Sequence, residues 1–437
     1  MPFECDNCGA TTEIPETFFK ERKSFRKTTR TLCPACWKRD KASIHAKLLA
    51  FQLAPGPIGL LFLLLMPHEP VGWILMNLFL LQVLLIVLIL PHEWGHAWAA
   101  KLADWYVYRI YIGFGETLVR RKILGFLTEL HTIPVVGLVL AAPRSKKHFK
   151  VGQFFFVLAG PAATVALMVL GAWLCGFKRL SNFHALETGL APGQLFVYAN
   201  GLLLMGSFWP GPVATPLGKL SSDFKLLLQN LRFGDSKALE YHAASFVLEA
   251  VTFRDMGQYG KARSCLENGL AQYPDNRLLL SYQGINLLDL GEFAKARDFF
   301  MQMLALPMME PGAKPMVLNN IAYVDALLGK AELLDEAEQY SAAAMADLSW
   351  MPPIIGTRGT VLVKLGRIEE GIQLLRKAME GHDEAHGKAQ NACFLAMAEA
   401  KRGNLEQGRK YLEEARRLDP TCFLLEKALE VEGLSSR

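Results

Sequence analysis

The sequence predicts a mainly α-helical membrane protein with a soluble helical repeat region and a small cysteine-rich segment. Three observations support this fold class. Apolar residues crowd into roughly residues 48–215, the C-terminal part contains an internal repeat, and two C-x-x-C pairs stand near the N-terminus. A chain of 437 residues has room for two or three domains. We predict domain boundaries at 1–47, 48–230 and 236–437.

The N-terminal segment contains two cysteine pairs, Cys5 with Cys8 and Cys33 with Cys36, separated by 24 residues. Four thiolates in this pattern form two knuckles that close a tetrahedral zinc site. The segment has too few apolar residues to fold without the metal. A zinc ribbon is therefore predicted, and two unrelated pairs or a redox pair are the alternatives. Because no signal-like apolar run precedes the cysteines, reduced cytoplasmic thiols are favoured over a disulfide framework.

Four membrane spans are predicted, at residues 48–66, 71–103, 151–177 and 194–210. Each is near or above the roughly 20 apolar residues that cross about 30 Å of hydrocarbon, and the last is the shortest. Ten lysines and arginines precede the first span and eight lie in 104–150, whereas the other two connections have none and two. The positive-inside rule then predicts that both termini and the 104–150 connection are cytoplasmic. A buried soluble core is the alternative.

The connection 104–150 contains the aromatic, alternating stretch Tyr106–Phe114 and the apolar run Ile133–Ala142, which is too short to span. These features predict strands or a re-entrant piece at the inner face of the membrane. Non-helical backbone at that depth is stable only where protein covers it or where it lines a wet cavity.

The C-terminal region repeats itself with a period of 34 residues, since Met256–Ala262 matches Leu290–Ala296. This period and its Gly, aromatic and Ala positions resemble the tetratricopeptide repeat. About five units are predicted, the third lengthened by some seven residues. Stacked helix pairs of this kind form a solenoid that binds peptides or partner proteins on its concave face. A generic helical bundle is the alternative. Further equivalents of the repeat are Leu333–Ala337, Leu365–Gly371 and Arg402–Gly408.

The sequence His92-Glu93-Trp94-Gly95-His96 lies at the end of the second predicted span. Two histidines four residues apart project from one helix face, so both imidazoles can bind one zinc ion. Zinc acidifies a water molecule, and Glu93 is placed to take its proton as the general base of peptide hydrolysis. Ionisable side chains inside a span are costly and usually functional. The alternative is a His/Glu cluster without a function at the interface.

A catalytic zinc site needs a third protein ligand and one open position. Three acidic residues are candidates for that ligand. Asp104 and Glu116 lie eight and twenty residues after His96, and Asp223 follows the fourth span. The Pro- and Gly-rich residues 210–216 could turn Asp223 back towards the metal.

With these motifs the chain resembles the site-2 protease family of intramembrane metallopeptidases over about residues 71–230. The resemblance also rests on Ile112–Gly115, Ile133–Gly137 and Leu158–Pro161. It implies a catalytic zinc ion and selects Asp223 as its third ligand, because Thr215–Asp223 is similar to one branch of the family. Phe224 and Val136 depart from the family pattern, which usually has glycine at both positions.

Several other polar residues have two interpretations. Asn200 matches a family asparagine thought to contact substrate backbone or the oxyanion, but a buried asparagine bonded to a neighbouring carbonyl is an equal alternative. Gly160 and Pro161 are predicted to pack helices. His131 could line the cavity, although an interface histidine is favoured. His382 and His386 are predicted to lie on the surface.

The predicted function is zinc-dependent hydrolysis of peptide bonds in transmembrane helices, with release of a membrane-tethered regulator. Strands within 104–150 could pair with an unwound substrate. The zinc ribbon and the repeats are expected to select substrates or partners, and no nucleic-acid partner is expected. A membrane-anchored repeat scaffold with a vestigial metal site is the competing hypothesis. A zinc-dependent transporter or sensor is disfavoured, because the polar residues of a transport path are lacking.

Overall fold

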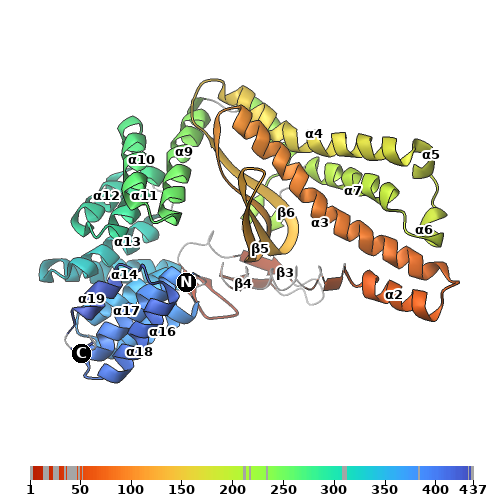
Figure 1. Cartoon of the computed structure of the whole chain (residues 1–437). Helices are drawn as coiled ribbons and strands as arrows, with labels where there is room; N and C mark the ends of the chain where they lie inside the picture. The colour runs from red at the N-terminus through yellow and green to blue at the C-terminus, as the bar shows by residue number, and fades with distance from the viewer. Residues whose placement is uncertain are drawn as a thin grey trace. The chain divides into compact units, whose positions relative to one another are not determined.

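The computed structural model describes the chain apart from residues 1–2, 13–18, 23–28, 34–35, 37–46, 48–49, 52, 210–212, 216–217, 233–234, 308–312, 382–383, 432 and 435–437. The chain divides into two compact units. One is Lys38–Thr252, and the other combines Met1–Trp37 with Phe253–Arg437. Helices make up most of both units (Figure 1).

Two helices of the first unit are long and apolar enough to cross a membrane. They are α3 (Pro70–Leu102) and α4 (Phe149–Cys175), with mean hydropathies of 2.7 and 2.1 in their most apolar windows. These helices match the predicted spans 71–103 and 151–177. The other two predicted spans correspond to shorter helices, α2 (Pro55–Leu65) and α7 (Pro192–Ser207). At 1.5 Å per residue, these cover roughly 17 and 24 Å, less than the hydrocarbon core. The structure thus provides two of the four predicted spans as full-length helices.

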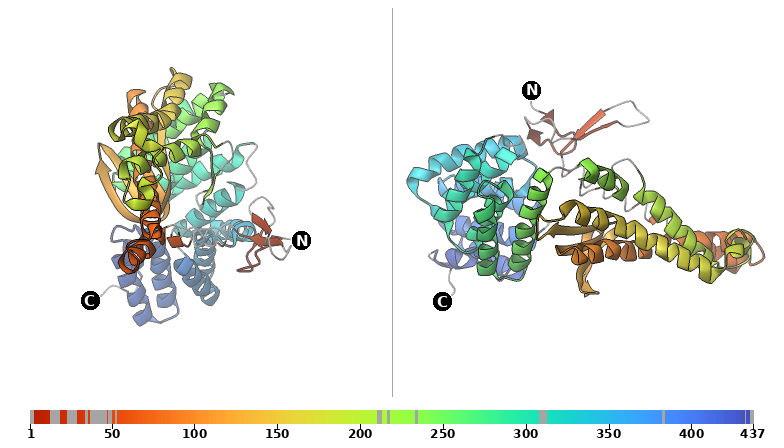
Figure 2. Two further views of the ribbon diagram at one scale, coloured as in Figure 1. Left: turned by 90° about the vertical axis from the view of Figure 1, so that its right-hand side faces the viewer. Right: turned by 90° about the horizontal axis from the view of Figure 1, so that it is seen from above.

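Helices α3, α4 and α7 run side by side, as both figures show (Figures 1 and 2). The side chain of Asn77 ties the loop before α7 to α3. It donates to the carbonyls of Leu186 and Gly189 at 3.0 and 2.7 Å and accepts from Ala191 N–H at 3.0 Å. A buried amide with all these bonds satisfied fixes where α7 begins. Two short helices lie in this loop, α5 (Phe177–Leu180) and α6 (Ala185–Thr188).

Each of the two long helices contains one proline in its interior, Pro91 in α3 and Pro161 in α4. Proline lacks the N–H that would bond to the carbonyl four residues earlier. Pro91 directly precedes His92, and Pro161 directly follows Gly160. Both helices therefore lose one backbone hydrogen bond beside the sequence motif.

The predicted strands of 104–150 form one long antiparallel hairpin, β5 (Trp105–Ile123) and β6 (Phe126–Pro143). The hairpin is bulged and folded so that Ile110–Ile112 pair on both edges, with Gly137–Val139 and with Thr128–Leu130. The apolar face of the hairpin packs against the second half of α3. The residues of this core are Ile89 and Ala97 of α3 with Ile110, Ile112, Phe126 and Val139.

The segment after α7 returns the chain to the ends of α3 and α4. It contains a small antiparallel hairpin, β7 (Val213–Thr215) and β8 (Gly218–Leu220), and then helix α8 (Asp223–Arg232). Helix α8 packs on α4, where Asn230 Nδ2 donates to the Lys150 carbonyl at 2.9 Å. This contact positions the N-terminal residue of α8, which is Asp223.

Helix α9 (Asp235–Asp255) packs against the base of the β5–β6 hairpin. The Tyr106 hydroxyl donates to Thr252 Oγ1 at 2.6 Å, and His242 Nε2 donates to the Arg144 carbonyl at 2.9 Å. The Tyr241 ring lies 5.4 Å from the Phe149 ring. Most of α9 is therefore part of the same compact unit as the hairpin.

The second unit contains the predicted repeats. Its helices are α10 (Tyr259–Gln272), α11 (Arg277–Asp289), α12 (Phe293–Ala305), α13 (Ala313–Leu328), α14 (Ala331–Leu348), α15 (Pro352–Lys364), α16 (Ile368–Gly381), α17 (Ala385–Lys401), α18 (Leu405–Leu418) and α19 (Leu424–Leu429). Consecutive helices pack in pairs. The turns that follow α9, α11, α13, α15 and α17 each contain one glycine with positive φ, which only glycine adopts without strain. These glycines are Gly257, Gly291, Gly329, Gly366 and Gly403.

The helices that follow these turns bury small and apolar residues at one recurring spacing. In α10 and α12 the sets are Ala262, Leu266 and Gly269, and Ala296, Phe300 and Met303. The third repeat departs in two places. Its turn glycine, Gly329, comes 38 residues after Gly291 instead of 34, and its first buried small residue, Ala337, comes three positions later in the helix. The predicted extension of about seven residues is thus divided between two sites.

The described part of the N-terminal segment forms two short antiparallel hairpins. Strands β1 (Phe3–Glu4) and β2 (Thr11–Thr12) form the first, and β3 (Phe19–Arg22) and β4 (Thr29–Leu32) form the second. The four predicted cysteine ligands lie at the ends of these hairpins.

Candidate metal centres

The first candidate centre lies where α3 crosses α4. His92, Glu93 and His96 are buried, with 9, 6 and 5 % of their surfaces exposed. The helices approach closely here because two positions have no side chain. A Cβ at Gly95 would lie 2.5 Å from the Ala159 carbonyl oxygen, and one at Gly160 would lie 2.2 Å from His96 Nε2. Gly160, which was predicted to pack helices, therefore packs directly against the imidazole of His96.

Residues of α4 orient both imidazoles through their Nδ1 atoms. His92 Nδ1 lies 2.8 Å from Thr164 Oγ1, and the Thr164 hydroxyl donates its single proton to the Gly160 carbonyl at 3.2 Å. Thr164 must therefore accept a hydrogen bond from His92 Nδ1–H. His96 Nδ1 lies 2.6 Å from the Phe156 carbonyl, which can only accept. Both Nδ1 atoms therefore carry protons, and neutral rings present lone pairs at Nε2.

The two Nε2 atoms face each other and the carboxylate of Asp223. They lie 3.3 Å apart, His92 Nε2 lies 3.3 Å from Asp223 Oδ2, and His96 Nε2 lies 3.4 Å from Asp223 Oδ1. Lone pairs and an anion at these distances repel one another unless a cation lies among them. Tetrahedral zinc with bonds of about 2.0–2.2 Å separates its ligand atoms by roughly 3.3–3.6 Å. The donor set fits a zinc ion in both chemistry and spacing.

Of the three acidic candidates, Asp223 is the one that joins the imidazoles. Asp104 lies outside this cluster, and the side chain of Glu116 lies outside the described residues. Phe224, which replaces the family glycine, packs its ring 5.6 Å from that of Phe208 at the end of α7.

Glu93 lies one residue along the helix from His92, and its carboxylate faces strand β6. A Cβ at Gly137 would lie 2.2 Å from Glu93 Oε1, so only glycine fits at this point of the strand. Gly137 belongs to the Ile133–Gly137 motif noted in the sequence. The hairpin therefore brings its backbone directly against the predicted general base.

The other polar residues singled out in the sequence make hydrogen bonds or ion pairs of their own. Asn200 is 1 % exposed and donates from Nδ2 to the Phe196 carbonyl at 2.8 Å, while its buried Oδ1 has no hydrogen-bond partner among the described residues. His131 Nδ1 contacts the Gly115 carbonyl at 3.1 Å, and its Nε2 lies 3.5 Å from Glu129. His386 bonds to Asp419 at 2.5 Å on the partly exposed surface of the repeats. His382 lies outside the described residues.

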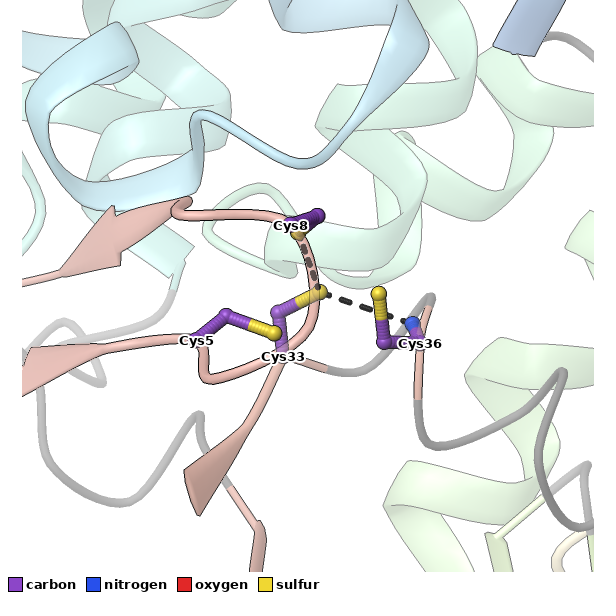
Figure 3. Close-up of side chains that lie close together, drawn as sticks. All are labelled: Cys5, Cys8, Cys33 and Cys36. Atoms are coloured by element: carbon purple, nitrogen blue, oxygen red, sulfur yellow. Dashed lines mark hydrogen bonds between the residues drawn. The ribbon is translucent and has the colours of Figure 1, made fainter. Parts of the chain in front are cut away.

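The second candidate centre is formed by the four N-terminal cysteines, whose side chains converge in Figure 3. Cys8 Sγ lies 3.7 Å from Cys33 Sγ. Tetrahedral zinc with Zn–S bonds of about 2.3 Å separates sulfur atoms by roughly 3.8 Å. Burial raises the pKa of the Cys5 thiol, but backbone N–H groups of Cys33, Asn7 and Cys8 lower it to about 7. The eight cysteines, all among the described residues, form no disulfide bond.

Sequence reasoning missed Thr164 and the Phe156 carbonyl, which orient the two imidazoles. Thr164 stands four residues after Gly160, and this spacing on a helix was the only available signal. A main-chain carbonyl gives no signal at all, because every residue has one.

The fold and this centre define a membrane metallopeptidase. The chain belongs to Peptidase family M50, the site-2 protease family, whose family model matches residues 80–386, more than half of the chain. The resemblance noted in the sequence is thereby confirmed. Members of this family are zinc-dependent integral membrane peptidases.

Several solved structures match part of the chain at low sequence identity. A thermophilic TPR protein of Thermus thermophilus, TTC0263, is 18 % identical with a TM-score of 0.35, and the match covers 43 % of this chain and 98 % of that one. YrrB, a TPR protein with an unusual peptide-binding site, is 18 % identical with a TM-score of 0.28, and the match covers 44 % of this chain and 96 % of that one. PilW, a type IV pilus biogenesis factor, is 17 % identical with a TM-score of 0.32, and the match covers 46 % of this chain and 91 % of that one. The comparison with curated proteins gave no match.

Proposed function

We propose that this protein cleaves peptide bonds within transmembrane segments of membrane-tethered proteins, with one zinc ion held by His92, His96 and Asp223. The convergence of the two Nε2 atoms and the Asp223 carboxylate at 3.3–3.4 Å carries this proposal. When bound there, zinc would polarise the substrate carbonyl and acidify water. This arrangement, in which both Nδ1 atoms are hydrogen-bonded and both Nε2 atoms face Asp223, favours a working metal site over the vestigial site of the scaffold hypothesis.

Glu93 acts as general base in this proposal. Its buried carboxylate takes a proton from the attacking water and delivers it to the leaving amine. Thr164 and the Phe156 carbonyl keep both imidazoles in one tautomer throughout. Asn200 is proposed as a substrate contact, because its buried Oδ1 has no hydrogen-bond partner among the described residues.

The substrate would bind as an extended strand along β6. Between Ile133 and Gly137, which pair with β5, residues 134–136 have no strand partner among the described residues, and Val135 is 40 % exposed. A substrate strand that pairs here lies beside Gly137 and therefore beside Glu93. Pairing would replace backbone hydrogen bonds that the substrate helix loses when it unwinds in lipid.

We further propose four spans with both termini in the cytoplasm. The short helix α2 is preceded by residues in helical conformation at Lys47, Ala50 and Phe51, so the span can begin near residue 48. Helix α7 is 16 residues long and is bound by Asn77 at its start. Its short length is compatible with a thinned bilayer around the site.

The test is cleavage of a single-span model substrate by the full-length protein in proteoliposomes. Wild type should cleave, and Glu93→Gln should retain zinc but lose about a hundredfold to ten-thousandfold in rate. Mass spectrometry locates the cut, and elemental analysis gives the zinc content. Equal rates in both proteins, or no cleavage by wild type with the catalytic zinc present, would favour the scaffold hypothesis.

The repeats and the ribbon are proposed to recruit substrates or protein partners. A chain ended after Asp255 keeps α9 and its contacts to Tyr106 and Arg144. This truncation should still cleave the model substrate but should process the native substrate more slowly. Unchanged processing of the native substrate would exclude the recruiting role.

A further inference from the structure

A shallow cavity of about 290 Å³ lies where the start of α4 meets the end of α8. It is separate from both candidate metal centres. Five residues line it: Lys150, Val151 and Phe154 of α4, and Asn230 and Leu231 of α8.

The lining combines one cation with apolar walls that open to the surroundings. Lys150 is exposed, and Val151 and Leu231 are 54 and 75 % exposed. Exposed apolar side chains of this kind are costly in water but not beside lipid. A ligand that fits must carry a negative charge next to an apolar body.

Asn230 adds an unpartnered polar atom. The residue is 5 % exposed, and its Nδ2 donates to the Lys150 carbonyl. Its Oδ1 is buried without a hydrogen-bond partner among the described residues. Such an acceptor is satisfied by a ligand hydroxyl or ammonium group.

We infer that this cavity binds an anionic phospholipid with a headgroup donor, as in phosphatidylglycerol. The phosphate pairs with the Lys150 ammonium, the headgroup hydroxyl reaches Asn230, and the first acyl carbons cover Phe154 and Leu231. The volume suits a headgroup and the upper part of the chains. The predicted topology places this end of α4 at the cytoplasmic leaflet.

Occupancy of this cavity also bears on α8 as a whole. The helix carries Asp223 at its first residue and lines the cavity at Asn230 and Leu231. A lipid that bridges Lys150 and Asn230 reinforces the bond that holds α8 on α4. This consequence rests on the proposed metal role of Asp223, but the lipid site itself does not.

The test uses the full chain in nanodiscs that contain equal amounts of phosphatidylglycerol and phosphatidylcholine. Native mass spectrometry counts the lipids that stay bound after release. Wild type should retain phosphatidylglycerol preferentially, and Lys150→Gln should reduce its retention about fivefold, as expected for one basic residue at an anionic surface. Lys147→Gln is the matched control, because it removes an equal charge outside the cavity.

A second pair of variants tests the apolar wall. Leu231→Ser should lower retention, whereas Leu228→Ser, which is 47 % exposed on the same helix but does not line the cavity, should not. Equal loss in Lys150→Gln and Lys147→Gln, or equal retention of both lipids by wild type, would overturn the assignment. Binding of free glycerol 3-phosphate as tight as that of the lipid would also overturn it, in favour of a soluble phosphate.

Discussion

Gly160 lies directly against the His96 imidazole, so that a Cβ at residue 160 would come within 2.2 Å of Nε2. That nitrogen is the atom proposed to bind zinc. Even one methyl group on α4 must therefore displace either the ring or the metal.

Gly160→Ala should abolish zinc binding at this centre and slow cleavage by about a hundredfold or more, because displacements near 1 Å have effects of that size. Zinc content and the rate in proteoliposomes measure both effects. Gly201→Ala is the control, since its Cβ would meet only Met168 Sδ at 3.9 Å. A Gly160→Ala protein with full zinc content would show that the ring does not occupy the position described.

Thr164→Val should weaken zinc binding about tenfold to a hundredfold, because His92 Nδ1–H then loses its acceptor and the ring can turn. Thr164→Ser keeps the hydroxyl and should restore the affinity. Competition with a chelator measures the zinc dissociation constant. If valine and serine had the same affinity, the hydrogen bond to Thr164 would not orient the ring.

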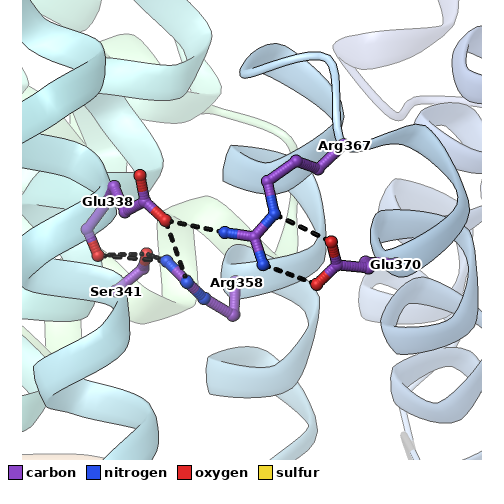
Figure 4. Close-up of polar contacts among 5 residues, drawn as sticks. All are labelled: Glu338, Ser341, Arg358, Arg367 and Glu370. Carbon is purple, nitrogen blue, oxygen red and sulfur yellow. Dashed lines mark hydrogen bonds and ion pairs between the residues drawn. The ribbon is translucent and has the colours of Figure 1, made fainter.

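Two arginines of the fourth repeat differ in how much they should stabilise it (Figure 4). Arg358 is 14 % exposed and donates to the Glu338 carbonyl and to Ser341 Oγ at 3.1 and 3.0 Å. Arg358→Ala removes two charge-assisted hydrogen bonds, although the Ser341 hydroxyl still donates to the Glu338 carbonyl at 3.1 Å, and should cost about 2 kcal/mol. Arg367 is 44 % exposed between Glu338 and Glu370, so Arg367→Ala should cost less than about 1 kcal/mol. Native-state hydrogen exchange in α14–α16 measures both values, and the reverse order would contradict this account.

Cys33→Ser should remove the N-terminal metal, lowering the zinc content from two ions per chain to one. Residues 3–12 and 29–36 should then exchange their amide hydrogens rapidly, because the two hairpins have a small core of their own. Cys175→Ser, which changes a thiol of α4 outside the cluster, should keep both ions. Slow exchange in Cys33→Ser would mean that the hairpins fold without metal.

Local sequence signals predicted much of this protein. The apolar composition of α3 and α4 can be read from the sequence, because it involves neighbouring residues of one helix. The same holds for the spacing of His92 and His96. The repeat period is local in the same sense. The sequence did not show that the extra residues of the third repeat are divided between two sites. A repeat period gives only the total length of a unit, so it cannot show on which side of a turn residues are inserted.

Contacts between distant segments were harder to predict. The residues alone left Asp104, Glu116 and Asp223 open, since Asp223 reaches His92 across 131 positions, and only the family resemblance selected it. The folding of the hairpin, with Ile110–Ile112 paired on both edges, depends on bulges that leave no clear composition signal. The span count was uncertain for a similar reason, since hydropathy does not show where a helix ends.

The prolines beside the motif have a consequence for the supply of water. Pro91 and Pro161 each leave one main-chain carbonyl, at residues 87 and 157, without its helical donor. In a lipid surrounding, such oxygens attract any hydrogen-bond donor that can reach them. Hydrolysis consumes one water for every bond cut, and a water molecule that enters this part of the two helices can donate a hydrogen bond to either carbonyl.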